Sequence, residues 1–179
     1  MNVYLAGMIG AGKTTVGRCL ARQLGWAFDD LDAAMEIQAG KTFHQVVADE
    51  GWLGFRQWEY RICKGFARLD RTVVALGGGT VRFDWNRDAL VGTGVKVVLV
   101  CDLGEIANRV RTDDRPRVNP GSTLEQDLES IWGQHAADYL SFADIVYSTD
   151  RGKTPEAEAS ELVSLVSERF GLVGCGVTR

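Results

Sequence analysis

Short apolar runs, mostly of β-branched residues, alternate along the chain with longer segments whose apolar residues recur at helical spacing. The runs predict strands at 2–7, 26–30, 72–76, 95–100 and 143–148. The segments between them predict helices at 13–24, 32–38, 43–50, 55–69, 84–91, 103–111, 123–139 and 155–169. Strands separated by helical crossovers favour a mainly parallel sheet covered on both faces, so we expect an α/β fold.

Length and composition fit one compact domain. The 179 residues are 45% hydrophobic, which is enough to bury a core, and we expect a single domain over residues 1–170 with a glycine-rich, flexible tail over 171–179. The formal net charge of -4 provides no basic field for nucleic acid or membranes, so neither is expected as a partner. Four scattered cysteines and two histidines fit neither a zinc site nor a disulfide framework, which favours reduced thiols and a cytoplasmic location.

The first predicted strand runs directly into GMIGAGKTT, residues 7–15, which matches the phosphate-binding pattern G-x-x-x-x-G-K-[ST] between a strand and a helix. Its glycines let successive N–H groups point at a phosphate, Lys13 reaches the β- and γ-phosphates, and Thr14 offers a hydroxyl to Mg²⁺. The residues expected to hold ATP here are Gly10, Ala11, Gly12, Lys13, Thr14 and Thr15.

This loop indicates a nucleotide but not a reaction. We find no NKxD-type motif of the kind with which GTPases read their base. A motor-type ATPase would need an acidic residue at the end of a neighbouring strand, and Asp102 is a candidate, although it is equally placed to cap the helix that follows.

Asp30 and Asp32 follow the second predicted strand, where alternate side chains point the same way. An aspartate at the carboxyl edge of a parallel sheet can hold metal-bound water or accept a proton from an attacking alcohol. The alternative is that the pair only caps the next helix.

Three later features fit the binding of a negatively charged acceptor. Arg56 can hold a carboxylate in bidentate fashion or form a surface pair with Glu59. Gly77–Gly79 allow close approach of a ligand to the backbone, or form a plain turn. Arg115 lies in a charged segment, at 112–122, that is either a mobile lid over the phosphates or a solvated loop.

In order, GMIGAGKTT, DDLD, FRQWE, LGGGTV and DDRPRV resemble the shikimate kinase family over about residues 2–155. The resemblance implies a three-layer α/β/α P-loop kinase with a five-stranded parallel sheet of order 2-3-1-4-5, acceptor-binding helices near 32–60 and a monomeric enzyme. It implies transfer of the ATP γ-phosphate to the 3-hydroxyl of shikimate in the chorismate pathway. It assigns Asp30 to Mg²⁺, Asp32 to the acceptor and to base catalysis, Arg56 and Gly77–Gly79 to the acceptor, Arg115 to the lid, and Arg109 and Pro155 to adenine.

One departure keeps the acceptor open. Where the family has R-x-P-L-Y, whose arginine also holds the shikimate carboxylate, this chain has HAADY, which places His135 at the acceptor site. The lid also carries Arg117 and Val118 where apolar pairs are usual. Two other readings therefore stand beside shikimate kinase: a P-loop kinase of another small hydroxylated compound, such as a hydroxy amino acid or polyol, and a catalytically weak nucleotide-binding protein that acts through partners.

Overall fold

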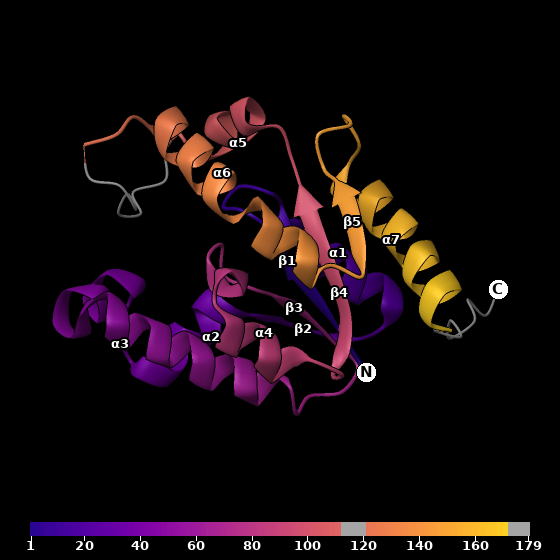
Figure 1. Ribbon diagram of the computed structural model, residues 1–179. Helices are drawn as coiled ribbons and strands as arrows, with labels where there is room; N and C mark the ends of the chain where they lie inside the picture. Colours follow the sequence, from indigo (N-terminus) through magenta and orange to yellow (C-terminus); the bar gives the residue numbers. More distant parts are fainter. Residues whose placement is uncertain (112–120, 172–179) are drawn as a thin grey trace.

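The computed structural model describes residues 1–111 and 121–171 and arranges them in three layers (Figure 1). The strands are β1 (Asn2–Ala6), β2 (Ala27–Asp30), β3 (Thr72–Ala75), β4 (Gly94–Val100) and β5 (Ile145–Ser148). The helices are α1 (Lys13–Leu24), α2 (Leu31–Ala39), α3 (Phe43–Phe66), the 3₁₀ turn η1 (Thr80–Arg82), α4 (Asp84–Leu90), α5 (Leu103–Val110), α6 (Leu124–Phe142) and α7 (Pro155–Phe170).

All five strands pair in parallel in the order β2-β3-β1-β4-β5, which confirms the predicted sheet. β1 lies in the middle, with β3 and β4 on either side of it. Because the strands run the same way, the loops that follow them converge at one edge of the sheet, where open α/β sheets bind their ligands.

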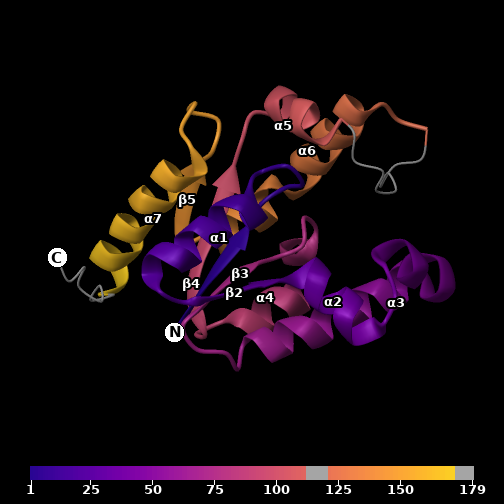
Figure 2. The ribbon, with the colours of Figure 1, turned by 180° about the vertical axis from the view of Figure 1, so that it is seen from behind.

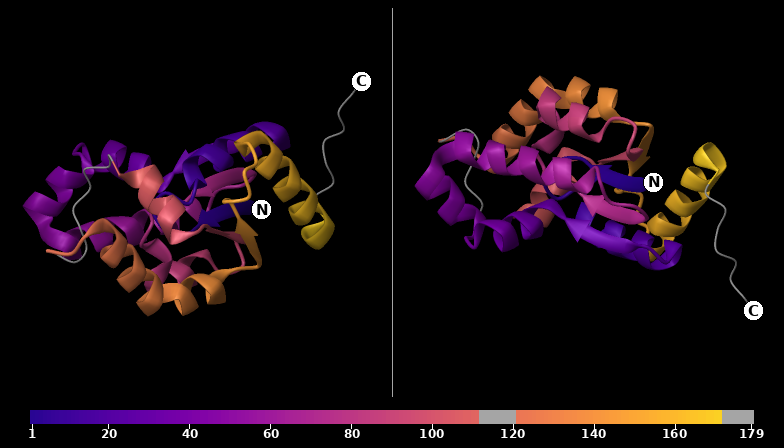
Figure 3. Two further views of the ribbon diagram at one scale, coloured as in Figure 1. Left: turned by 90° about the horizontal axis from the view of Figure 1, so that it is seen from above. Right: turned by 90° about the horizontal axis from the view of Figure 1, so that it is seen from below.

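Alternation along β1 shows how the sheet divides the core. Val3 and Leu5 face one side and join the apolar residues of α1 and α7, whereas Tyr4 and Ala6 face the other side and join those of α3 and α6. Figures 2 and 3 show α1 and α7 on one face of the sheet and α4 and α6 on the other. The two-sided burial explains why the strands read as nearly continuous apolar runs.

The helix boundaries differ from the sequence prediction at a few places. The predicted helices at 43–50 and 55–69 form one element, α3, with a break at Gly51, where φ is 68° and ψ is 179°. A positive φ is easy for glycine, so α3 changes direction there without strain. α6 continues to Phe142, three residues beyond the prediction, and η1 had no sequence signal.

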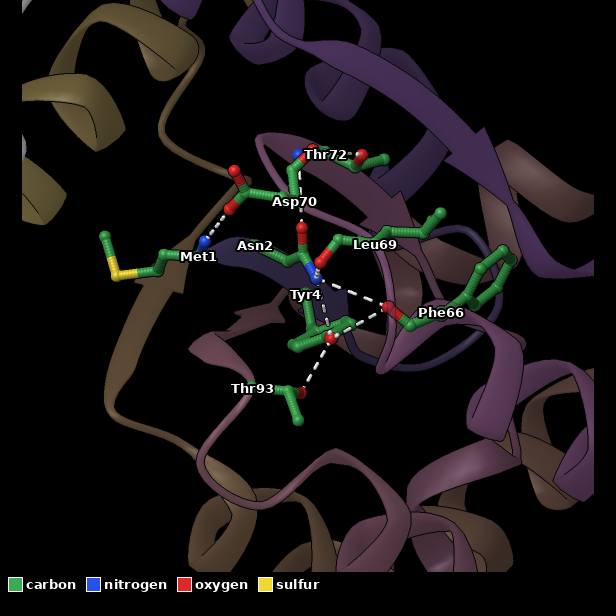
Figure 4. A network of polar contacts seen from close by, with 8 residues as sticks. All are labelled: Met1, Asn2, Tyr4, Phe66, Leu69, Asp70, Thr72 and Thr93. Carbon is green, nitrogen blue, oxygen red and sulfur yellow. Dashed lines mark hydrogen bonds and ion pairs between the residues drawn. The ribbon is translucent and has the colours of Figure 1, made fainter.

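A buried polar network ties the start of β1 to α3 and β3 (Figure 4). The fully buried Asn2 donates from Nδ2 to the carbonyls of Leu69 at 2.8 Å and Phe66 at 3.3 Å, and its Oδ1 accepts from the N–H of Thr72 at 3.2 Å. Buried polar groups are tolerated only when hydrogen-bonded, so this one side chain fixes three segments together.

Within the described ranges, no helix is both long enough and apolar enough to cross a membrane.

Candidate active site

The loop between β1 and α1 has the backbone conformation of a phosphate cradle. Gly7, Gly10 and Gly12 have φ angles of 139°, 73° and 93°, a region in which other residues are strained. At Gly7 a Cβ atom would also lie 2.3 Å from the carbonyl oxygen of Leu99. No side chain caps the start of α1, so its first N–H groups and its positive dipole end are left to an anion.

Lys13 is buried at the mouth of this cradle. Its Nζ donates to the carbonyls of Gly7 at 3.0 Å and Met8 at 2.8 Å. The ammonium is therefore held over the loop before any ligand arrives, and little side-chain entropy remains to be lost on binding.

Asp30 has two roles in the structure. Its Oδ1 accepts from the N–H groups of Asp32 at 3.0 Å and Ala33 at 3.4 Å, which makes it the cap of α2. Its Oδ2 accepts from the hydroxyl of Thr14 at 2.7 Å. The predicted cap is thus confirmed for Asp30. Asp32 lies inside the first turn of α2 and does not cap the helix.

Thr14 and Asp30 fit a magnesium ion held jointly by protein and nucleotide. Mg²⁺ usually takes one or two protein oxygens and completes its shell with phosphates and water. The described residues contain no group of three or more His, Cys, Asp or Glu side chains that would hold a metal by itself. A hydroxyl and a carboxylate oxygen 2.7 Å apart beside the phosphate cradle match the shared arrangement.

A pocket runs from the cradle toward α5 and α7, and we call it the P-loop pocket because the P-loop forms one wall. Seven of the eight residues expected to hold the nucleotide line it, and they are Gly10, Gly12, Lys13, Thr14, Thr15, Arg109 and Pro155. The eighth, Ala11, is buried and gives its N–H to the Met8 carbonyl at 3.2 Å, so the structure does not turn that donor toward the pocket.

Arg109 closes the far end of the P-loop pocket. Its guanidinium donates to the carbonyl of Thr149 at 2.9 Å, to that of Gly10 at 3.3 Å and to Glu105 Oε1 at 3.0 Å. Pro155, the first residue of α7, lines the same pocket. A planar guanidinium and a proline ring in one lining suit a planar heterocyclic base.

A second pocket opens on the other side of the sheet edge, and we call it the triglycine pocket because Gly77–Gly79 form its floor. Phe43, Trp52 and Phe55 supply an aromatic wall, and Arg56 and Glu59 lie beneath it. The glycines are needed at this spot, because a Cβ at Gly77 would lie 2.8 Å from the Thr80 hydroxyl and one at Gly78 3.2 Å from the Ile9 nitrogen. The N–H of Thr80 donates to the Gly77 carbonyl at 3.1 Å, which confirms the predicted turn, while the close approach of a ligand stays a prediction.

Arg56 and Glu59 form the predicted pair, but inside the pocket rather than on the surface. The side chains are 15% and 1% exposed, and Glu59 Oε1 also accepts from the Thr80 hydroxyl at 2.9 Å. Burial raises the pKa of Glu59, while the Arg56 guanidinium opposes that rise. The surface-pair reading is therefore wrong in its location, because α3 packs this face against the Phe83 ring and the glycine turn.

Asp32 lies where the two pockets meet. It lines both of them, as do Ile9, Gly78 and Val110. From this position its carboxylate reaches a group bound on either side, which is the placement required of a base acting between an acceptor and a phosphate.

Two expected functional residues are absent from the described lining of both pockets, and a third lies outside the described part of the chain. Asp102 caps α5, with Oδ1 accepting from Gly104 at 2.9 Å and Glu105 at 3.2 Å, so the helix-cap reading is confirmed and the motor-type role gains no support. His135 bonds Asp138 through Nδ1 at 2.9 Å and is absent from the described lining of both pockets. Arg115, with most of the proposed lid, lies outside the described residues.

Several lining residues were missed from the sequence, where Arg82 was considered only as an alternative partner for the acceptor carboxylate. Arg82 and Asp127 line the triglycine pocket, and Lys153 and Glu158 line the P-loop pocket. Tyr139 joins the first group and donates its hydroxyl to the Gly78 carbonyl, and burial raises its pKa to about 12. None carries a motif, and only the charge of Arg82, three residues after Gly79, was a usable signal.

Comparison with known proteins is consistent across sequence and structure. A family model described as "Shikimate kinase" matches residues 9–167. The chain is 36% identical to shikimate kinase 2 of Dickeya chrysanthemi over 164 residues, covering 90% of this chain and 93% of that one. It is 33% identical to a Legionella pneumophila shikimate kinase over 162 residues, covering 90% and 92%. The solved Acinetobacter baumannii shikimate kinase in complex with shikimate superposes with a TM-score of 0.88 at 32% identity, covering 94% of each chain.

Proposed function

The chain belongs to the shikimate kinase family, and we propose that it transfers the γ-phosphate of ATP to the 3-hydroxyl of shikimate. The products are shikimate 3-phosphate and ADP. The similar Acinetobacter baumannii structure holds shikimate, which supports the choice of acceptor.

One observation carries the proposal: the P-loop pocket and the triglycine pocket meet at Asp32. A direct phosphoryl transfer needs the acceptor hydroxyl and the γ-phosphate side by side with a base between them. A nucleotide-binding protein without catalysis would need only the first pocket.

In the proposed reaction, Asp32 accepts the proton of the 3-hydroxyl while the oxygen forms a bond to the γ-phosphorus. The bond from that phosphorus to the β,γ-bridging oxygen breaks, and ADP leaves with the electron pair. Lys13 neutralises charge on the transferring group from its fixed place over the loop. Magnesium, held with the nucleotide by Thr14 and Asp30, would offset the charge between the phosphates.

Further assignments follow from the family and from the lining of the pockets. We propose that Arg109 and Pro155 enclose adenine and that Arg56 and Gly77–Gly79 contact the acceptor. The acceptor helices near 32–60 rest on the resemblance alone. The single domain and a lid near 112–122 that carries Arg115 rest on the sequence and the resemblance together. A monomeric state rests on the resemblance to the family, and the free thiols of Cys19, Cys63 and Cys101 support a reducing, cytoplasmic setting.

The test is ADP release with a panel of small hydroxylated acids and polyols, each at millimolar concentration. Phosphorylation of shikimate, with little turnover of gluconate or homoserine, is expected. Rapid turnover of another alcohol while shikimate is ignored would reject the proposed acceptor but keep the kinase. ATP binding without transfer to any of them would reject the kinase as well.

A further inference from the structure

Arg56 alone provides too little positive charge in the triglycine pocket to bind an acid firmly. Arg56 is already in an ion pair with the buried carboxylate of Glu59, so its guanidinium is shared with that group. A second cation beside this pair would strengthen the binding of an incoming carboxylate.

Arg82 is the cation in the right place. It is the last residue of η1, it lines the triglycine pocket, and its guanidinium lies across Gly79. A Cβ at Gly79 would lie 2.5 Å from Nη2 and 3.0 Å from Nε of Arg82, so the missing side chain at Gly79 makes room for the guanidinium.

The Nε atom of Arg82 is buried and has no hydrogen-bond partner among the described residues. An unsatisfied buried donor is unfavourable and rare in folded proteins. Nε and Nη2 together form the fork that matches the two oxygens of a carboxylate. The Nε–Nη2 side of the Arg82 guanidinium can therefore bind a carboxylate, and its buried Nε donor lacks a partner among the described residues.

The segment that carries Arg82 is held from the opposite side. Arg87 donates to the Val81 carbonyl at 2.7 Å and to Asp138 Oδ1 at 3.2 Å. Asp138 in turn bonds His135 at 2.9 Å, and this hydrogen bond, together with the Arg87 charge, keeps the pKa of Asp138 below its usual range. The Arg87–Asp138 pair therefore links α6 to the segment of η1 and α4, and His135 supports Asp138 from within α6.

We propose that Arg82 binds the carboxylate of the acceptor and orients the acceptor in its pocket. This inference rests on the proposed function, because the acid concerned is shikimate. Arg82 lies beside Gly79 at one end of the triglycine floor, whereas Asp32 lies at the other, with Oδ1 3.4 Å from the position of a Cβ at Gly77. Binding the carboxylate at the first end presents the hydroxyls to the base at the second.

The experiment compares shikimate with its neutral methyl ester in wild type, Arg82→Gln and a control, Arg68→Gln, which makes the same change at an exposed site in neither pocket. A charge-assisted bidentate contact predicts that Arg82→Gln raises KM for shikimate about tenfold to a hundredfold and removes the preference for acid over ester. The KM for ATP and kcat should stay close to wild type, because the contact is remote from the transferring phosphate. Arg68→Gln should keep both the KM and the preference.

An unchanged acid preference in Arg82→Gln overturns the proposal. The proposal is also overturned if His135→Gln loses the preference for shikimate over the ester while Arg82→Gln keeps it. Should Arg82→Gln fold poorly, Arg82→Lys keeps the charge and the stem but not the fork, and it should give a KM between those of wild type and Arg82→Gln. Wild-type protein that turns over neither compound rejects the proposed function itself, which separates the two failures.

A variant with an added arginine tests the same assignment independently. His135→Arg should leave KM for shikimate unchanged, because position 135 does not line the pocket and Arg82 already serves the acid. A tenfold fall in KM would show instead that the carboxylate lacks a partner from α6, and it would overturn the assignment.

Discussion

Asp30 offers a test that separates structural support from function within one side chain. One carboxylate oxygen caps α2, and the other accepts from Thr14 at 2.7 Å, where we place magnesium. Asparagine keeps an oxygen that caps a helix as well as aspartate does, whereas alanine loses the cap. Asp30→Asn and Asp30→Ala therefore both remove the negative charge of the carboxylate, but only Asp30→Ala should lower the stability of the fold.

The magnitudes follow from these contacts. Loss of the cap in Asp30→Ala should cost about 1 kcal/mol, which lowers Tm by about 2–4 °C in a domain of this size. Asp30→Asn should stay near the wild-type Tm, because the lost charge at the helix start is offset by relief of Asp29, whose pKa is raised by burial and by the Asp30 charge. Both variants should raise the Mg²⁺ concentration for half-maximal velocity by about tenfold to a hundredfold.

The assay is initial velocity against Mg²⁺ at saturating ATP and shikimate, together with thermal melts without ligand. Asp29→Asn is the matched control, since its side chain alternates to the other face of β2 and does not line the P-loop pocket. An unchanged Mg²⁺ requirement in Asp30→Asn would falsify the metal role and leave Asp30 as a helix cap.

Three further changes have clear expected outcomes. Lys13→Met should abolish turnover, while the circular dichroism spectrum should remain that of a folded protein. Its Tm should be modestly lower, because two P-loop carbonyls lose the Lys13 donor. Retained turnover would reject the phosphate site. Asp32→Asn should lower kcat by roughly 10²-fold or more with ATP binding little changed, and a larger loss in Asp102→Asn would instead favour a motor-type ATPase. Asn2→Ala should lower Tm by about 4–8 °C at unchanged KM, because the Thr72 N–H and the Leu69 carbonyl lose the hydrogen bonds that Asn2 gives them. A Tm at the wild-type value would show that water replaces the network.

Local patterns predicted much of this molecule correctly. Runs of apolar residues located the five strands, and the P-loop motif placed Lys13 and Thr14 at the start of α1. The period of two in a strand also brought out Asp30, whose contact with Thr14 joins residues 16 positions apart. The strand order itself came from the family resemblance, since periodicity gives no order.

Other features depend on segments that are distant in the chain and were decided only by packing. A three-residue spacing predicts that Arg56 and Glu59 meet, but only the packing of α3 on the glycine turn buries the pair and neutralises it. The family resemblance placed His135 at the acceptor, whereas the described lining of the triglycine pocket includes Arg82 and not His135, which bonds Asp138. Hydrophobic period and motif spacing act over a few residues and so determine elements and backbone cradles. Burial and charge pairing depend on which side chains meet across the fold, and so only the tertiary structure decides them.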